Sequence, residues 1–569
     1  MKTQLQPQSF LQTISILSIL VLAFLVRMIG VNFGLPDVFH ADEPIIVNHA
    51  LAFGAGDLNP HFFKIPPLVS YVLFFVYGIY FLIGSLVGYF KSVDDFLNLF
   101  LRDSTSFYLL GRIIFGIMLG TGTVYVLYRL VRTFFSTAHG LLSAFFLAVS
   151  FLHVRDSHYI YADIPLLFLL VFSFFPIFKV LEHGERKDYL WFGVLFGAAV
   201  ATKYNAVFLS FPFLLAHSIR KRSIKLIFTS IELYLALVLS VCIFFMLNPF
   251  SLIDLRFFIS ELLAQSQSEG FLGFFHHFKY SLSGGMGISL FYLSLAGILW
   301  SVFLRDSKRL VMLSFVVVYS VVLAVWSQPY DRYALPLLPF LCLFASDALI
   351  KMSEKIKILQ KWPFVFAVAF AIPSMAKIAV SDCLFLQKDV RTEAREWIEQ
   401  HIPSNSKVAL DIPFYVPKLK PSLNQLIERK NEIMSTAHDK AQQIRFNLLI
   451  SEAEKNSKAR YKLFFLNQEG SQNNFIFSKP SIPYNLQSLK EAGIEYVVIS
   501  QVNRNLNSQF NSNLKTEGTL LKKFSPYKDE KIEWSLDDLP LTGGPFLWKD
   551  LINRRAGGQI IKIYKLKNV

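Results

Sequence analysis

Cysteine and charge are both scarce in this sequence. Its 569 residues include only three cysteines, Cys242, Cys342 and Cys383, which lie far apart in the chain. Two of them fall within apolar runs, so neither a disulfide framework nor a cysteine metal knuckle is supported. Charged residues make up 17% of the chain, whereas hydrophobic residues make up 53% and are gathered in long blocks. This distribution excludes an ordinary soluble enzyme.

Glycine-rich loops that would bind a nucleotide are also lacking. Gly120-x-Gly122 and Gly193-xxx-Gly197 fall within apolar segments, where close helix packing explains them better. The net charge of +15 is divided among short basic clusters between apolar blocks, which argues against a nucleic-acid partner. The adjacent pair His276-His277 would point its side chains about 100° apart on a helix, which disfavours one shared metal ion.

Long apolar blocks recur through the first two-thirds of the chain. A run of about 18 apolar residues can cross a membrane as a helix. The first block, Phe10–Val26, is followed by Arg27 without a cleavage site, so we expect it to remain as the first span. The blocks predict a polytopic α-helical membrane protein with about 11 transmembrane helices. The further predicted spans are 106–131, 139–152, 162–181, 189–203, 205–219, 224–247, 287–304, 309–327, 332–350 and 362–380.

Basic connectors predict the orientation of these spans, because Lys and Arg are enriched in cytoplasmic loops. Five basic connectors fall on one side if the apolar stretch Leu68–Tyr89 does not cross. We therefore predict that this stretch lies along the outer interface, or dips in and returns, within a long first external loop at 31–105. The residues after about Asp382 are then also external. The connectors are Arg129/Arg132, Arg186/Lys187, Arg220/Lys221/Arg222/Lys225, Arg305/Lys308/Arg309 and Lys351/Lys355/Lys357/Lys361.

The composition becomes mixed and polar from about Gln387. Short β-rich runs alternate with helix-like stretches at Arg391–Gln400 and Gln425–Glu454. We predict a membrane module at 1–384, followed at 385–569 by an extracytoplasmic α/β domain that recognises the acceptor or gives support. The predicted strands are Lys407–Leu410, Tyr461–Leu466, Tyr496–Ser500 and Gln559–Leu566.

Two acidic motifs open segments on the predicted outer side. Asp42-Glu43 precedes Pro44 shortly after the first span, and Asp163 opens a later span. An acidic residue at the lipid boundary is costly unless it serves a cation, accepts a proton or caps a helix. Helix N-capping is the structural alternative and, taken alone, is favoured at both Asp42 and Asp163.

Three cations also lie on the predicted outer side. Lys64 stands between aromatic residues and a double proline, while Arg332 and Lys203 depart from the tendency of basic residues to lie inside. Lys64 could meet a phosphate at headgroup depth, and Arg332 could clamp a phosphate leaving group. The alternatives are a snorkelling lysine at Lys64, a local pair of Arg332 with Asp331, and the mere end of a short span at Lys203.

Read in chain order, these motifs resemble the GT-C superfamily of membrane glycosyltransferases. They are similar to the branch that contains the protein O-mannosyltransferases and the bacterial aminoarabinose transferases acting on lipid A. The resemblance covers roughly 27–349, and Asp389–Asp411 also resembles bacterial members. The motifs are Asp42-Glu43, Lys64-Ile-Pro-Pro-Leu, Ala-Asp163-Ile-Pro, Ala201-Thr-Lys203-Tyr-Asn and Arg332-Tyr-Ala-Leu-Pro-Leu-Leu-Pro339.

The resemblance implies an inverting enzyme of a bacterial inner membrane. It would move a sugar, mannose-like or another hexose or pentose, from an isoprenoid-phosphate donor to a protein, lipid or glycan acceptor outside the cytoplasm. Asp42 would be the general base, with Glu43 beside it. Asp163 would position the acceptor or help to hold a divalent cation. Asp42 and Asp163 are the candidate metal ligands, and whether a metal is required stays open.

The resemblance also implies that Lys64 and Arg332 neutralise the leaving phosphate, with Lys203 a weaker candidate. Phe63 stands where the aminoarabinose transferases commonly carry an acidic residue, and Ile65 intervenes before the prolines. These departures argue against a lipid A role and against a metal role for this loop. The alternatives are a flippase for a lipid-linked sugar, which usually has internal repeats and mid-span ionisable residues, and a noncatalytic assembly protein.

Overall fold

The computed structural model describes residues 7–265, 273–325, 330–436, 440–455, 459–467, 480–501, 508–535 and 547–567. The chain divides into two units. Unit 1 comprises Met1–Val31, Asn59–Leu73 and Leu110–Asp382, and unit 2 comprises Asn32–Leu58, Phe74–Leu109 and Cys383–Val569. Much of the predicted first external loop therefore clusters with the C-terminal residues.

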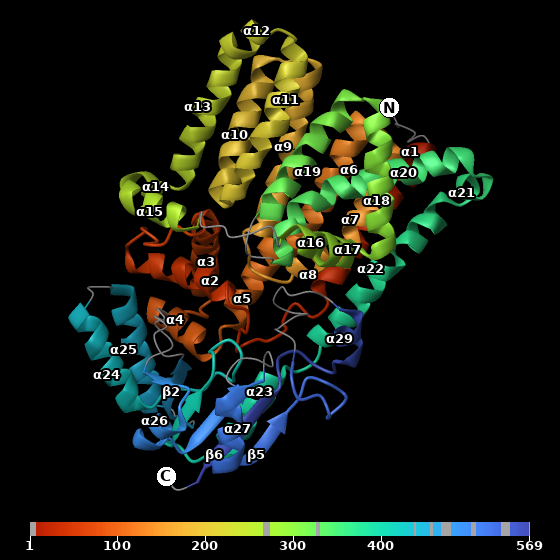
Figure 1. Ribbon diagram of the computed structural model, residues 1–569. Coiled ribbons are helices and arrows are strands. Elements are labelled where there is room, and N and C mark those ends of the chain that lie inside the picture. The colour runs from red at the N-terminus through yellow and green to blue at the C-terminus, as the bar shows by residue number, and fades with distance from the viewer. Residues whose placement is uncertain are drawn as a thin grey trace. The chain divides into compact units, whose positions relative to one another are not determined.

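Unit 1 is helical throughout its regular structure (Figure 1). Two further helices, α3 (Leu68–Leu86) and α5 (Thr105–Gly111), have residues in both units, and α22 (Pro363–Phe385), the last helix of unit 1, continues three residues into unit 2. The elements of unit 1 are α1 (Pro7–Met28), η2 (Arg112–Met118), α6 (Leu119–Phe134), α7 (Thr137–Ala148), α8 (Phe151–Asp156), α9 (Asp163–Glu182), α10 (Arg186–Thr202), η3 (Tyr204–Leu209), α11 (Ser210–Lys221), α12 (Ile224–Thr229), α13 (Ile231–Leu247), α14 (Phe250–Ile253), α15 (Leu255–Gln265), α16 (Gly273–His276), η4 (His277–Leu282), α17 (Ser283–Met286), α18 (Ile288–Leu304), α19 (Ser307–Val325), η5 (Asp331–Leu337), α20 (Leu338–Lys355), α21 (Lys357–Lys361) and α22 (Pro363–Phe385).

Within the described residues, seven helical segments are long and apolar enough to cross a membrane. An eighth is added if His277–Met286 and Ile288–Leu304, which meet at an angle of 109°, form one bent span. The chain is therefore a polytopic helical membrane protein, and the total of about 11 spans stays a prediction. The seven segments are Leu11–Met28, Leu68–Leu86, Thr105–Phe134, Asp163–Glu182, Ser307–Val325, Asp331–Lys355 and Pro363–His401.

Helix α3 is the stretch that we predicted not to cross. It is one continuous helix of 19 residues, and it passes the same test of length and apolarity as the other candidate spans. A course that dips into the membrane and returns would need a break, and no break interrupts Leu68–Leu86. Of the two predicted courses, only the one along the interface is compatible with this helix.

Helices α10 and α13 pack closely at two glycines. A Cβ atom on Gly193 would lie 2.7 Å from the carbonyl oxygen of Ala236, and one on Gly197 would lie 2.5 Å from the carbonyl oxygen of Ser240. Both distances are too short for a side chain, so the two backbones can approach only because glycine stands at these positions. The predicted packing role of Gly193-xxx-Gly197 is confirmed.

We expect Gly197→Leu to destabilise the protein by about 1–3 kcal/mol, because the new side chain would push α13 away from α10. Thermal unfolding of the purified protein in detergent measures this loss. The matched control is Gly78→Ala, since no atom lies within 4 Å of an ideal Cβ at Gly78. Equal melting temperatures for Gly197→Leu and the wild type would contradict the close packing.

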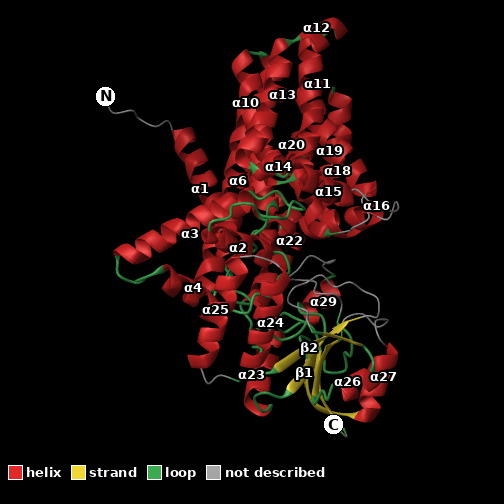
Figure 2. Cartoon of the chain, turned by 90° about the vertical axis from the view of Figure 1, so that its left-hand side faces the viewer, coloured by secondary structure: helices red, strands yellow, loops and turns green. Residues whose placement is uncertain are grey.

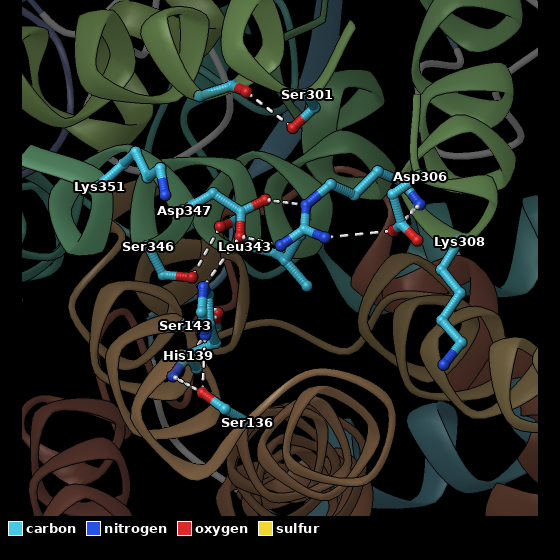
Figure 3. A network of polar contacts seen from close by, with 12 residues as sticks. Ser136, His139, Ser143, Ser301, Asp306, Lys308, Leu343, Ser346, Asp347 and Lys351 are labelled. Atoms are coloured by element: carbon cyan, nitrogen blue, oxygen red, sulfur yellow. Dashed lines mark hydrogen bonds and ion pairs between the residues drawn. The ribbon is translucent and has the colours of Figure 1, made fainter. Parts of the chain in front are cut away.

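A polar network joins α7, α19 and α20 (Figure 3). Asp347 of α20 accepts hydrogen bonds from Arg309 at 2.9 and 2.8 Å, and it lies 3.1 Å from Nε2 of His139. Ser136, in turn, lies 2.7 Å from the other ring nitrogen of His139. The carboxylate is buried, so its two partners offset the cost of removing the charge from water. Arg309, predicted as a topology signal, thus also ties helices together.

Within its described residues, unit 2 contains a six-stranded mixed sheet in the order β3-β2-β1-β4-β6-β5. Its strands are drawn in yellow in Figure 2. The first four strands in this order are parallel, and β6 pairs antiparallel with both β4 and β5. The elements are α2 (Glu43–Ala52), η1 (Phe53–Ala55), α4 (Val93–Arg102), α23 (Val390–His401), β1 (Lys407–Leu410), α24 (Leu423–Thr436), α25 (Lys440–Lys455), β2 (Lys462–Asn467), β3 (Ser481–Pro483), α26 (Leu486–Glu491), β4 (Tyr496–Ser500), α27 (Ser508–Glu517), β5 (Gly518–Phe524), α29 (Trp548–Asn553) and β6 (Ile561–Leu566).

Alternation along β1 divides the core of this sheet into two clusters. Val408 and Leu410 pack with Ala394 and Ile398 of α23, whereas Ala409 packs in a second cluster with residues of α26 and α27. Successive side chains of a strand point to opposite faces. Helix α23 therefore covers one face of the sheet, and α26 and α27 cover the other.

The four predicted strands coincide with β1, β2, β4 and β6, and the first predicted helix coincides with α23. The second predicted helix is divided into α24 and α25, and 437–439 between them lie outside the described residues. Strands β3 and β5, which we did not predict, form the two edges of the sheet. Strand β3 has only three residues, and β5 exposes four consecutive side chains, so neither carries the alternation that marks a half-buried strand.

Candidate functional site

Asp163 and Lys203 form an ion pair within unit 1. Asp163 begins α9 and is buried, whereas Lys203 directly follows α10 in an extended backbone conformation. Lys203 Nζ donates a hydrogen bond to Asp163 Oδ1 over 2.5 Å. The lysine side chain remains 20% exposed and also lies over the ring of Tyr333, 5.2 Å from its centroid. The lysine ammonium group thus contacts a carboxylate and an aromatic ring at the same time.

The capping interpretation of Asp163 is wrong. Ala162 occupies the N-cap of α9, Asp163 is the first helical residue, and no side-chain cap hydrogen bond forms. The Asp163 carboxylate instead accepts a hydrogen bond from Lys203, 40 residues later in the chain. Sequence proximity could not reveal this partner. Lys203 likewise does more than end a short helix.

Arg332 is surrounded by tyrosines. It lies in η5, next to the start of α20, and Nη1 donates a hydrogen bond of 2.8 Å to the hydroxyl of Tyr161. The guanidinium carbon lies 4.9, 4.8 and 5.6 Å from the ring centroids of Tyr161, Tyr330 and Tyr333, respectively. Stacking on aromatic rings orients the planar guanidinium while leaving its charge intact. Tyr333 thus connects Arg332 with Lys203.

The loop that carries Lys64 is anchored by its neighbour Phe63. The amide of Phe63 donates a hydrogen bond of 2.7 Å to Glu261, and its carbonyl accepts one of 2.8 Å from the hydroxyl of Tyr204. Burial, and secondarily Glu261, raise the pKa of Tyr204, so this hydroxyl keeps its proton and remains a donor. Lys64 itself is exposed. Tyr204, which holds the backbone beside Lys64, directly follows Lys203, which binds Asp163.

Asp331 is held by residues that are distant in the sequence. One oxygen accepts a 2.5 Å hydrogen bond from Ser281 and lies 3.1 Å from Nε2 of His276, and the other lies 4.0 Å from Arg155. The carboxylate is fully buried. The sequence had suggested a local pair of Asp331 with Arg332 and did not predict these partners. The arrangement of the basic connectors predicts an outward-facing turn at Ser327–Tyr333 around Asp331, and 327–329 lie outside the described residues.

A second buried carboxylate, Asp156, neighbours the ion pair. Arg155 binds it at 2.8 Å through Nε and 2.6 Å through Nη2. Burial raises the pKa of Asp156 to about 6, the charge of Arg155 opposes this shift, and the charge of Asp163 adds to it. The charge of Arg332 also favours ionised Asp156. In the sequence, Arg155, Asp156 and His158 make this predicted external loop unusually polar, but that polarity alone assigns no role to Asp156.

The raised pKa of Asp156 predicts a pH-dependent contribution to stability. Folding raises the pKa of Asp156 from 3.8 to about 6. The contribution of Asp156 to the stability of the folded state is therefore fully present below pH 3.8 and is lost as the pH rises to about 6. Asp156→Asn removes the titration. We expect the melting temperature of the wild type minus that of Asp156→Asn to fall between about pH 4 and pH 6. A difference that stays constant over this range would contradict the assignment.

Asp42 and Glu43 belong to unit 2, where they begin α2. Asp42 occupies the N-cap position and Pro44 stands in the first turn, yet the Asp42 side chain makes no capping hydrogen bond. Its backbone amide instead donates a 3.1 Å hydrogen bond to Nδ1 of His40. Glu43 is fully buried, whereas Asp42 is half-buried. The capping interpretation is thus correct for the position of Asp42 and wrong for its carboxylate.

The surroundings of Asp163 do not fit a divalent cation. Its Oδ1 already accepts a hydrogen bond from the ammonium group of Lys203, and a metal ion at that oxygen would meet a like charge. Across the described ranges, moreover, no group of three or more His, Cys, Asp or Glu residues is arranged to hold a metal ion.

These observations define a multi-pass helical membrane protein with a cluster of cations, carboxylates and tyrosines in its helical unit. Residues 97–247 match the model of the dolichyl-phosphate-mannose-protein mannosyltransferase family. The matched segment contains Asp163 and Lys203. It confirms the predicted resemblance to GT-C glycosyltransferases of the protein O-mannosyltransferase branch. A search of curated proteins gave no match.

A comparison with solved structures gave three that are similar in part to this chain. ArnT from Cupriavidus metallidurans, bound to undecaprenyl phosphate, has a TM-score of 0.49 and 13% identity, over 91% of this chain and 97% of that one. The Archaeoglobus fulgidus oligosaccharyltransferase, tethered with an acceptor peptide, has a TM-score of 0.45 and 13% identity, over 85% and 69%. The S. cerevisiae Pmt1-Pmt2 complex, bound to the sugar donor, has a TM-score of 0.32 and 21% identity, over 48% and 36%.

Proposed function

We propose that this protein is an inverting glycosyltransferase that moves a sugar from an isoprenoid-phosphate donor to a hydroxyl of a protein, lipid or glycan acceptor. The single observation that carries the proposal is the clustering of Arg332, Lys203 and Asp163 around Tyr161 and Tyr333. Such a cluster offers fixed positive charge to a phosphate and aromatic faces to a sugar. The family match over 97–247 covers three of these residues, Tyr161, Asp163 and Lys203.

The leaving phosphate is proposed to bind Arg332 and Lys64. A guanidinium presents a planar set of donors to phosphate oxygens, and the tyrosines around Arg332 fix its plane. Lys64 is exposed and stands beside a backbone that Tyr204 and Glu261 hold. Negative charge grows on the phosphate as the bond to the sugar breaks, so these cations stabilise the transition state more than the bound donor.

Lys203 takes a supporting role in this proposal. Because Asp163 compensates much of its charge, Lys203 contributes less to phosphate binding than Arg332. Asp163 is proposed to orient Lys203 and the neighbouring Tyr204, and through Tyr204 the loop of Lys64. This role differs from that of a metal ligand.

Asp42 is proposed as the general base, with Glu43 as its acidic neighbour. The acceptor hydroxyl oxygen attacks the anomeric carbon, its proton passes to the Asp42 carboxylate, and the bond between that carbon and the phosphate oxygen breaks. The electron pair of this bond leaves with the phosphate, which departs as the isoprenoid monophosphate. Attack opposite the leaving group inverts the anomeric configuration.

We further propose that the protein lies in a bacterial inner membrane, with this chemistry on the extracytoplasmic side. This proposal includes about 11 spans and an external α/β domain at 385–569. The arrangement of basic connectors supports the orientation. Cysteine labelling from outside intact cells tests the orientation. A cysteine introduced at Lys407 should react with a membrane-impermeant reagent, and one at Lys357 should not.

The proposed function is tested by mass spectrometry of isoprenoid-phosphate sugars from cells that lack the protein. We expect one lipid-linked sugar to accumulate, and complementation with the wild-type gene should remove it. The mass of the accumulated lipid then gives the class of sugar, hexose or pentose, and the isoprenoid length. An unchanged set of lipid-linked sugars would contradict a role in their consumption.

A further inference from the structure

The segment Asp37–Glu43, which contains the proposed base, is bound by the C-terminal part of unit 2. Asp37 Oδ2 accepts hydrogen bonds from Thr392 Oγ1 at 2.8 Å and from Arg395 Nε at 3.3 Å. Thr392 and Arg395 stand three residues apart on α23, so one face of that helix supplies both donors. The Asp37 side chain is only 11% exposed, which protects the pair from solvent.

The next residue, Val38, is held through its backbone. Its carbonyl oxygen accepts a hydrogen bond from Lys418 Nζ. Its φ of 53° lies in the left-handed region, which a β-branched residue adopts only when its surroundings impose it. Burial, with the nearby charges of Arg391 and Arg445, lowers the pKa of Lys418 to about 8, whereas Asp37 and Glu43 favour its charged form.

Phe39 packs against a fixed arginine. Its ring centroid lies 4.0 Å from the guanidinium carbon of Arg391. Asp389 binds that guanidinium through two hydrogen bonds of 2.8 Å, and the carbonyl of Phe414 accepts a third of 2.8 Å. Arg391 therefore presents a rigid face, and Phe39 cannot shift without losing this stacking.

These contacts lead directly to Asp42. His40 is buried, and its Nδ1 accepts the hydrogen bond from the Asp42 amide, so the ring fixes the turn that precedes α2. At the other end of α2, η1 packs against α25 of the C-terminal region. Contacts from the C-terminal region thus hold the backbone on both sides of the helix that Asp42 begins.

We propose that Asp37, with Thr392 and Arg395 of α23, is a positioning element that sets the location of the Asp42 carboxylate. The C-terminal region of unit 2 would then act as part of the active-site scaffold, beyond acceptor recognition or general support. The catalytic part of this inference rests on the proposed function, while its structural part can be measured without any substrate. A displacement of about 1 Å in a reacting group can lower a rate about 10²-fold.

The structural part is tested by hydrogen–deuterium exchange of the full-length protein in detergent, followed in peptides that cover 38–43. We expect Asp37→Ala and Arg395→Ala each to speed exchange of these amides at least about 10-fold, because the clamp opens locally. The double variant should exchange no faster than Asp37→Ala, since Asp37→Ala already removes the contact with Arg395. Glu396→Ala, on the same helix but paired with Lys388, is the matched control and should exchange like the wild type.

If Asp37→Ala does not fold, Asp37→Asn replaces it, and we expect a smaller increase because an amide oxygen can still accept from Thr392. Unchanged exchange in every Asp37 and Arg395 variant would overturn the inference. An equal increase in Glu396→Ala would overturn it as well, because the effect would then belong to the helix as a whole.

The catalytic part is tested with the donor lipid isolated from the deletion strain. For Asp37→Ala we expect kcat, calculated per folded protein, to fall about 10- to 100-fold with KM for the donor unchanged. Normalisation to the folded fraction removes the contribution of misfolded protein, which would otherwise lower the apparent kcat in the same way. A wild-type kcat in Asp37→Ala, alongside an inactive Asp42→Asn, would reject the positioning role and leave the proposed function standing. If the wild type transfers no sugar, the proposed function fails, and hydrogen exchange still decides the structural part.

Discussion

Asp42→Asn is expected to lower kcat by about 10²- to 10⁴-fold, the range that a general base contributes. Asparagine has nearly the same shape but cannot take the proton of the acceptor hydroxyl. The Asp42 side chain makes no capping hydrogen bond, so we expect α2 and the folded yield to remain unchanged. The measurement is the rate of sugar transfer from the isolated donor lipid, normalised to folded protein.

The matched control for this substitution is Asp57→Asn, an exposed carboxylate in the same segment of unit 2. It should keep the wild-type rate and the wild-type melting temperature. If Asp42→Asn retained more than about a tenth of the wild-type rate, proton removal by Asp42 would be excluded as a main contribution to the rate.

Arg332→Ala is expected to lower kcat/KM for the donor by about 10²- to 10³-fold, because a fixed cation is lost where negative charge develops. Arg332→Lys should recover only part of this loss, since an ammonium group lacks the planar set of donors and stacks less well on Tyr161 and Tyr330. Steady-state kinetics with the isolated donor lipid measure both variants.

Two further variants separate the charge of Arg332 from its orientation. Tyr161→Phe removes the hydroxyl that accepts the Arg332 hydrogen bond and keeps the ring, so we expect a smaller loss of about 3- to 10-fold. Arg305→Ala removes an exposed arginine that follows α18 and should leave the kinetics unchanged. A similar loss in Arg305→Ala and Arg332→Ala would indicate a general effect of charge and contradict a specific phosphate contact.

Local patterns were sufficient where neighbours in the sequence decide the structure. The apolar run at 162–181 predicted α9 (Asp163–Glu182) to within one residue at each end, and the short β-rich runs predicted β1 and β4 to the residue. The spacing of Gly193 and Gly197 predicted a close helix contact. In each of these cases the pattern itself carries the physical cause, which is apolar length, strand alternation or the absence of a side chain.

Partners in the site could not be predicted in the same way. The carboxylate of Asp163 bonds to Lys203, and that of Asp331 bonds to Ser281, across 40 and 50 residues respectively. The most favourable local interpretations, a helix cap and an adjacent ion pair, depended only on near neighbours. A buried charge takes whichever partner the tertiary packing supplies, and a single sequence does not specify that packing.

The weakest step of the topology prediction was deciding which segments cross the membrane, because each crossing changes the side of every later loop. Segments such as Thr137–Ala148 are too short for an unaided crossing, and Leu68–Leu86 is long enough to cross although the basic connectors argue against it. Length and charge thus give conflicting answers for α3. A count of spans derived from one of these two criteria inherits the error of that criterion.

The central claim is that the donor is an isoprenoid-phosphate sugar and that the bond to phosphate is broken. It is tested most directly by incubating the purified protein in lipid nanodiscs with donor lipid and membranes from the deletion strain, the latter as the acceptor source. We predict that the wild type releases isoprenoid monophosphate in the same amount as the sugar joined to an acceptor, and that Asp42→Asn forms both products at least about 10²-fold more slowly. The account would be contradicted if the donor lipid stayed intact in the presence of the wild type, or if the isoprenoid were released as a diphosphate.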